Sequence, residues 1–209
     1  MSDFIRLEQT ELVVGRSFTN LDQNIGDVAT IAQMIHRLRL LLGEPSALPA
    51  EPRPLLLHLQ EADGRLHRIV SCQPDGLRSR ADLTWVGFFG QKRPELDPAP
   101  LDAMDKELMG ELARYPGILS YSSLQLAAGN WGNLVLLASP EVKEHWRTSE
   151  RHAYAAQEMA PRYYLAIRLH SGVLPGGLLS GQPAVIIRTK YYDFQTHEVW
   201  RALRELASA

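Results

Sequence analysis

Residues 117–141 read GILSYSSLQLAAGNWGNLVLLASPE, and the rest of the fold can be worked out from this stretch. Two apolar segments, 117–126 and 133–138, flank a turn over 127–132, which is typical of two adjacent antiparallel strands. A helix start follows directly, because the next residues suit an N-cap, a first helical position and a first-turn acid: Ser139, Pro140 and Glu141. The stretch therefore predicts strand, turn, strand and helix in succession.

The segments on either side continue this alternation of strands and helices. Before it, residues 83–91 predict a strand rich in aromatic residues and valine, and residues 101–115 predict a helix. After it, the helix from 140 runs to about 159 and Pro161 ends it; strands at 163–170 and 184–194 and a short helix at 198–206 follow. Over about residues 83–194 this order predicts an α+β fold, a ferredoxin-like antiparallel sheet with helices on one face.

The first 75 residues predict a strand, a helix and a hairpin. Residues 5–14 are strand-like, residues 25–42 carry apolar side chains at helical spacing, and strands at 54–60 and 66–72 flank an Asp63-Gly64 turn. A charged connector at 77–82 then separates two segments, 1–80 and 81–209. Either the first segment is a degenerate ferredoxin-like module, so that two fused modules form an α+β barrel, or it is no such copy.

The composition excludes several classes of function. The chain has 209 residues and a net charge of −2, so no global basic field attracts nucleic acid or acidic membranes. The single cysteine, Cys72, excludes an intramolecular disulfide and any multi-cysteine metal site. The apolar runs are far shorter than the roughly 20 residues of a membrane helix, and the N-terminus lacks a secretory signal pattern, so we expect a cytoplasmic protein.

The region from the turn to the following helix resembles a known superfamily. GNWGNLVL at 129–136 leads into Ser139-Pro140-Glu141 and then into HWRTSERH at 145–152. This pattern resembles the dimeric α+β barrel superfamily, which includes antibiotic-biosynthesis monooxygenase-like proteins, over about residues 83–194. The resemblance implies a barrel cavity faced by a helix histidine, and chemistry that ranges from cofactor-free oxygenation to isomerisation and haem-dependent reactions. Edge strands in such modules are usually covered, either by the first segment or by a second copy in a homodimer.

Two predicted strands carry cations and aromatic residues on one of their faces. Strand alternation places every second residue on one face of each strand, and most residues of these two faces are polar or aromatic: Tyr164, Ala166, Arg168 and His170 on one strand, and Ile186, Arg188, Lys190 and Tyr192 on the other. These faces predict a polar-lined cavity or, alternatively, a solvent-facing sheet surface. In a cavity, the residues expected to contact an anionic or aromatic substrate are Arg168, Arg188, Lys190, Tyr164 and Trp131, the last as a lid in the turn.

Three histidines are candidates for proton transfer or metal ligation. His170 is the candidate general acid or base because imidazole titrates near neutral pH, and His152 is a second candidate. His145 and His152 lie seven residues apart on one predicted helix, about 10.5 Å along its axis, so they cannot bind one small ion together. Haem needs a single axial histidine, for which the resemblance favours His152, with His145 as the alternative.

The sequence leaves three classes of function open. The first is an enzyme that acts on a small aromatic or anionic molecule in the cavity, either as a haem- or oxygen-dependent oxidoreductase or by proton transfer alone. The second is a non-catalytic protein that binds a small molecule there. The third is a structural protein whose barrel is an assembly interface. We expect the first, with no nucleic-acid or membrane partner.

Overall fold

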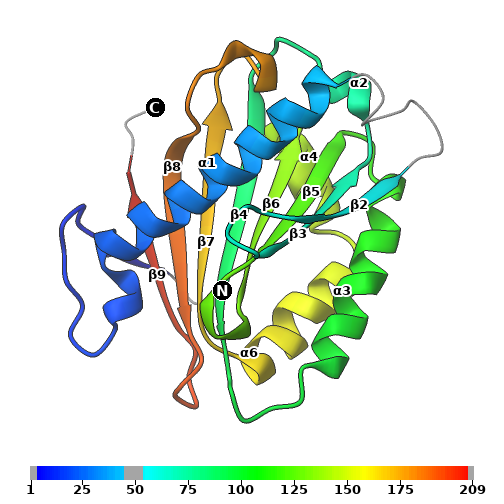
Figure 1. Ribbon diagram of the computed structural model, residues 1–209. Helices are drawn as coiled ribbons and strands as arrows, with labels where there is room; N and C mark the ends of the chain where they lie inside the picture. The colour runs from blue at the N-terminus through cyan, green and yellow to red at the C-terminus, as the bar shows by residue number, and fades with distance from the viewer. Residues whose placement is uncertain (1–3, 45–53, 207–209) are drawn as a thin grey trace.

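A curved nine-stranded sheet runs through the computed structural model, which describes residues 4–44 and 54–206 (Figure 1). The strand order is β1-β9-β8-β7-β4-β6-β5-β3-β2. Neighbouring strands are antiparallel except for β1 and β9, which are parallel. The strands are β1 (Ile5–Leu7), β2 (Leu55–Gln60), β3 (Leu66–Ser71), β4 (Leu83–Lys92), β5 (Ile118–Gln125), β6 (Trp131–Leu137), β7 (Tyr164–Leu174), β8 (Val185–Asp193) and β9 (Trp200–Glu205).

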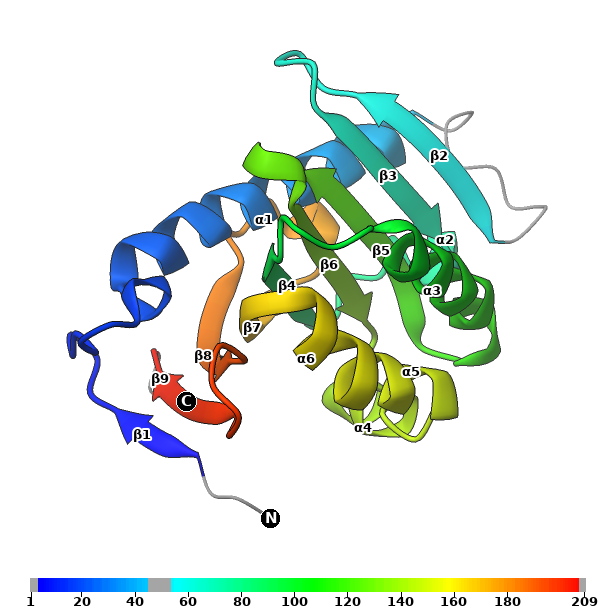
Figure 2. The ribbon, with the colours of Figure 1, turned by 90° about the horizontal axis from the view of Figure 1, so that it is seen from below.

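The centre of the sheet has the ferredoxin-like arrangement. In the order β7-β4-β6-β5, the first strand of the unit lies between the third and the fourth, and all three contacts are antiparallel. The connecting helices lie together on one face (Figure 2): α3 (Ala99–Glu111), α4 (Pro140–Trp146), α5 (Glu150–Tyr154) and α6 (Ala160–Tyr163). The predicted α+β fold class is thus confirmed.

The first eighty residues extend this sheet at both ends. The hairpin β2–β3 pairs with β5 through β3, and β1 pairs with β9 at the opposite edge. Helix α1 (Leu21–Gly43) crosses the face opposite to α3–α6, and the short α2 (Pro74–Leu77) follows the hairpin (Figure 2). Among the described residues no pairing joins β1 to β2, so the sheet is open rather than closed into a barrel.

Both faces of the sheet are covered by apolar side chains. Buried residues of α1 recur every three or four positions and pack on Trp85, Phe89 and neighbouring leucines of the central strands: Ile31, Met34, Ile35, Leu38 and Leu42. On the other face, Leu112, Val142 and Trp146 pack against Val135 and Leu137 of β6. Burial of each large apolar side chain contributes about 1.5–3 kcal/mol, so α1 is a principal source of stability.

Residues 200–205 form strand β9, and the predicted helix at 198–206 is wrong. Ala202 and Arg204 of β9 are buried, whereas Arg201, Leu203 and Glu205, which alternate with them, are partly exposed, as the two faces of a strand require. Arg204 donates hydrogen bonds to the main-chain oxygens of Glu8, Thr19 and Glu11, at 3.0, 2.6 and 2.6 Å. The same contacts explain why the predicted strand at 5–14 ends at Leu7: the following residues fold around this guanidinium.

The single helix predicted over 140–159 is broken into several parts. The chain leaves the helix after Trp146, and Ser149 caps a new one, its Oγ accepting from the His152 N–H at 3.2 Å. A π-helical turn, Ala155–Met159, then precedes α6, which contains Pro161. Proline has no N–H for the α-helical bond to the residue four positions earlier, and a π-turn accommodates this loss. Pro161 therefore distorts the helix without ending it.

Candidate functional site

A group of cations lies on the sheet face opposite to α1, where β7 and β8 meet α4. Arg188 and Lys190 point to this face because their cross-strand partners on β7 are Ser171 and Leu169. Lys143 of α4 reaches the same place and donates a hydrogen bond from Nζ to Ser171 Oγ, at 3.3 Å. We call Lys143, Arg147, Arg188 and Lys190 the basic cluster.

The cations of the basic cluster act on one another. Burial lowers the pKa of the Lys190 ammonium, and the nearby charges of Lys143, Arg147 and Arg188 lower it further, against a small opposing effect of Glu144. Burial also lowers the pKa of Lys143, with Arg147 and Arg188 acting in the same direction and Glu144 against it. Like charges held together in a half-buried place favour the neutral amine or a bound anion.

The carboxylates near the cluster neutralise it incompletely. Arg188 binds Glu205 at 2.9 Å and Arg147 binds Glu144 at 3.0 Å, in pairs whose side chains are each 42–64% exposed. Such exposed pairs contribute little because water screens them. Within residues 4–44 and 54–206, neither Lys143 nor Lys190 has a carboxylate at salt-bridge distance. The site therefore keeps positive charge that a bound anion would neutralise.

Aromatic rings border the cluster on the side of β8. The Lys190 Nζ lies 5.0 Å from the centre of the Phe4 ring, within the range of a cation–π contact. Phe4 meets Tyr192 edge to face at 5.8 Å, and Tyr192 stacks on Phe194 at 6.3 Å. An organic anion bound beside Lys190 would thus have apolar ring surface next to its charged group.

Arg168 and His170 lie on the other face of the sheet, under α1. The predicted alternation on β7 holds for Ala166, Arg168 and His170 but not for Tyr164, which a bulge shifts to the opposite face. Arg168 pairs with Tyr191 and His170 with Thr189, so Arg188 and Lys190 point away from them. The structure therefore separates the two halves of the substrate group proposed from the sequence. Alternation shows which side chains of one strand share a face. It does not show which side chains of the neighbouring strand lie on that same face.

Asp27 of α1 holds these two residues in a buried network. Its carboxylate accepts from Arg168 at 2.5 and 2.9 Å and contacts His170 Nε2 at 2.8 Å, while His170 Nδ1 lies 2.8 Å from Thr189 Oγ1. His170 and Thr189 are 0% exposed, and Asp27 is 5% exposed. The order Asp–His–Thr has the form of a nucleophile-activating relay, but α1 covers it, so its direct effect is to fix α1 on β7.

Trp131 lies away from the basic cluster, whereas Tyr164 lies on the same sheet face as that cluster, in one apolar group with Leu169 and Tyr192. A bulge between Gln91 and Lys92 shifts the pairing of Tyr164, which packs edge to face on Phe88 at 5.3 Å. Trp131 begins β6, and the Arg68 guanidinium lies 6.0 Å from its ring centre. Trp131 is thus part of the strand rather than the predicted turn.

The surroundings of His145 and His152 do not fit a haem. The two histidines lie on different helices, and the His152 ring packs 4.8 Å from that of Trp146, which occupies the space over one of its faces. His145 is exposed, with its ring 5.4 Å from that of Tyr115. An axial ligand must point into an apolar slot that admits the porphyrin, and neither contact provides such a slot.

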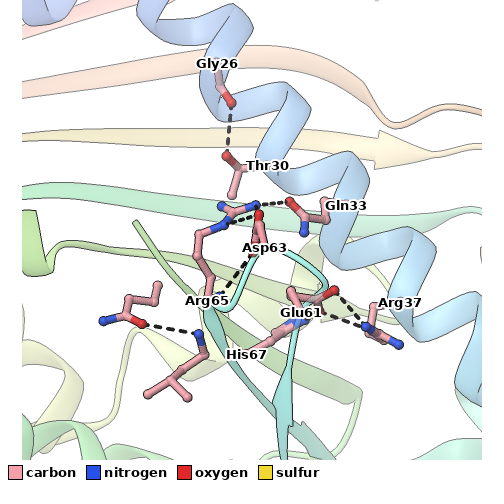
Figure 3. Close-up of polar contacts among 10 residues, drawn as sticks. Gly26, Thr30, Gln33, Arg37, Glu61, Asp63, Arg65 and His67 are labelled. Atoms are coloured by element: carbon pink, nitrogen blue, oxygen red, sulfur yellow. Dashed lines mark hydrogen bonds and ion pairs between the residues drawn. The ribbon is translucent and has the colours of Figure 1, made fainter. Parts of the chain in front are cut away.

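A second polar cluster, not anticipated from the sequence, joins the β2–β3 turn to α1 (Figure 3). Glu61 accepts from Arg37 of α1 at 3.1 and 2.8 Å and contacts His67 Nδ1 at 2.6 Å. The Arg37 guanidinium is the main reason that the pKa of Glu61 falls to about 2. Arg65 adds a bond to Gln33 at 2.6 Å. These contacts position the hairpin on the helix, which is a structural role.

The described parts of the chain, residues 4–44 and 54–206, contain neither a membrane-spanning helix nor a clustered metal site. No helix there has both the length and the apolar character needed to cross a bilayer. No group of three or more histidine, cysteine, aspartate or glutamate residues there could hold a metal ion.

Comparisons with known proteins give only partial structural likenesses. No protein-family model and no curated protein sequence matches the chain. Among solved structures, protein SO0527 from Shewanella oneidensis matches with a TM-score of 0.40 and 9% identity, over 46% of this chain and 92% of its own. A mutant of SnoaB, a cofactor-independent oxygenase from Streptomyces nogalater, matches with a TM-score of 0.35 and 13% identity, over 44% of this chain and 90% of its own. A major regulator of staphylococcal pathogenesis matches with a TM-score of 0.34 and 12% identity, over 69% of this chain and 92% of its own. At these scores the likenesses establish neither a family nor an activity.

Proposed function

We propose that the protein binds a small organic anion at the basic cluster, as its substrate or ligand. The observation that supports this most directly is the pair Lys143 and Lys190, two half-buried amines from facing elements with no carboxylate at salt-bridge distance among the described residues. Burial is the main reason that the pKa of each amine is lowered, and neighbouring cations add to it; an anion between the two amines would offset both effects. Arg188 beside them adds a planar donor suited to a carboxylate or phosphate.

An aromatic carboxylate suits this site better than a bare inorganic ion. Phe4 and Tyr192 lie next to Lys190 and offer ring surface on which an apolar body can pack. The charged group then contacts the cations while the ring is removed from water, so both parts of the ligand contribute to affinity.

The oxidative reaction implied by the superfamily resemblance remains a prediction. SnoaB is an oxygenase that needs no cofactor, but its likeness to this chain does not transfer a reaction. His170, the residue expected to move protons, lies under α1 on the opposite face from the basic cluster. Binding of the anion is accordingly the part of the function that the geometry supports.

Calorimetric titration with benzoate tests the proposal. We expect saturable binding that Lys190→Gln or Lys143→Gln weakens about tenfold or more, the effect of losing one charged hydrogen bond of about 1.5 kcal/mol. Added salt should weaken binding to the wild-type protein. Lys106→Gln, an exposed lysine on α3, is the matched control and should bind like wild type. Benzyl alcohol, which lacks the charge, should bind far more weakly; equal binding of both ligands, or none of benzoate, would refute the proposal.

A further inference from the structure

The basic cluster also holds a nucleophile. We propose that the Lys190 amine forms an imine with a bound 2-oxo acid, a ligand whose carbonyl group lies next to its carboxylate. The inference rests on the proposed function, because the neighbouring cations must first hold the carboxylate. It adds a covalent step and a class of substrate to the binding of an anion.

Lys190 is distinguished from the other lysines by its contacts. The chain has four lysines, at 92, 106, 143 and 190. Lys143 already donates to Ser171, and Lys106 is exposed on α3. The Lys190 Nζ lies over the Phe4 ring, which attracts it only through a cation–π contact, so a bond to carbon at this amine displaces no hydrogen bond to a carboxylate among the described residues.

The charges around Lys190 favour its neutral, reactive form. Helix α4 contributes Lys143, Arg147 and the opposing Glu144, and β8 contributes Arg188. On β9, Arg201 and Glu205 flank Leu203, the residue paired with Lys190, while β7 contributes only uncharged side chains here. Burial lowers the pKa of Lys190 most, and the neighbouring cations, which outnumber the carboxylates, lower it further. An amine beside other cations in a desolvated place is a recognised nucleophile toward carbonyl compounds.

The cluster can support both ends of such a ligand. The carboxylate would contact Lys143 and Arg188, which lie around Ser171 on the same face as Lys190. The lone pair of Lys190 Nζ would then attack the adjacent carbonyl carbon and form the carbon–nitrogen bond. The carbonyl oxygen leaves as water with the two hydrogens of the amine, so the step needs no oxidant or reductant.

Reductive trapping with pyruvate tests this step. The full-length protein is incubated with pyruvate and sodium cyanoborohydride, and the adduct is located by peptide mass spectrometry. We expect one adduct, at Lys190, with the mass of pyruvic acid less one oxygen atom. Lys190→Gln should lose it and Lys106→Gln should keep it. Acetone, which lacks the carboxylate, should give at least tenfold less adduct.

A variant next to the nucleophile separates an electrostatic role from a structural one. Lys143→Gln should move the pH profile of trapping to higher pH, because Lys190 loses a neighbouring cation, and Lys143→Arg should restore the wild-type profile. No adduct, or adducts spread equally over the lysines, would overturn the inference. The proposed function is judged separately with lactate, which has the carboxylate but no carbonyl: lactate binding without a pyruvate adduct would leave it standing, and absence of anion binding would reject both.

Discussion

Asp27 binds two residues of β7 at once, and this double contact decides how α1 lies on the sheet. Its carboxylate pairs with Arg168 and with His170, whose other nitrogen lies at Thr189. Burial lowers the pKa of His170 more than the attraction of Asp27 raises it. The imidazole is therefore held neutral in the folded protein although it is next to a carboxylate.

This balance predicts a loss of stability in mild acid. The folded pKa of His170 lies below the unfolded value of about 6.5, so the unfolded chain binds more protons and the free energy of unfolding falls as the pH drops below about 6.5. Buried His67 and half-buried His152 act in the same direction. Urea titrations between pH 7.5 and 5 should show this decrease, at most about 1.4 kcal/mol per pH unit for each histidine.

A substitution isolates the contribution of His170. His170→Gln should lower stability at pH 7 through the lost hydrogen bonds. Its free energy of unfolding should fall less steeply as the pH drops, because about one proton fewer is taken up on unfolding. His145→Gln, at an exposed histidine, is the control and should keep the wild-type slope. An unchanged slope in His170→Gln would show that His170 is not held neutral.

The candidate residues show what a single sequence can and cannot locate. Arg188 and Lys190 were predicted to bind an anion together, and they do share one face because strand alternation is a local property. Arg168 was placed with them, yet it lies on the other face because register between strands depends on tertiary pairing. Lys143 was not among the residues predicted from the sequence. Its four-residue spacing from Arg147 on the helix after β6 places two cations on one side of that helix, and this spacing can be recognised in the sequence.

At the scale of elements, the break between α4 and α5 predicts unequal effects at two serines. Ser149 caps α5 and donates to Glu111 of α3 at 2.9 Å, so Ser149→Ala should cost about 1–2 kcal/mol. Ser139 stands at the N-cap of α4 with extended backbone but makes no side-chain bond to a helix N–H. Ser139→Ala is therefore the matched control and should cost less, as urea unfolding of both variants would measure. Equal losses would contradict the assigned cap.

The elements predicted well are those in which a periodic pattern extends over many residues or a specific turn sequence is present. The hairpin β2–β3, the helix α1 and the strands β4–β6 all satisfy this condition, and the structure contains each of them. The residues of β9 include alanine, leucine, arginine and glutamate, which favour a helix when considered alone. Pairing with β8 and β1 outweighs that preference, and a short sequence carries no sign of such partners.

At the scale of the whole molecule, α1 connects the two halves of the chain. It belongs to the first eighty residues, but its apolar side packs on β4 and β6 of the ferredoxin-like unit. Five of its buried side chains together contribute about 10 kcal/mol, which is comparable with the entire stability of a typical domain. Without α1, the unit would expose Phe89, Leu134 and Leu136 to water.

The division of the chain at residue 80 can therefore be tested by expressing residues 81–209 alone. We expect this segment to lack a cooperative urea transition and to bind hydrophobic dyes or associate, because one face of its sheet has lost its cover. The full chain, studied in parallel by circular dichroism, should unfold in one cooperative transition, since a single sheet carries strands from both segments. A monomeric 81–209 segment that unfolds cooperatively would instead show that the ferredoxin-like unit is an independent domain and that α1 is an addition to it.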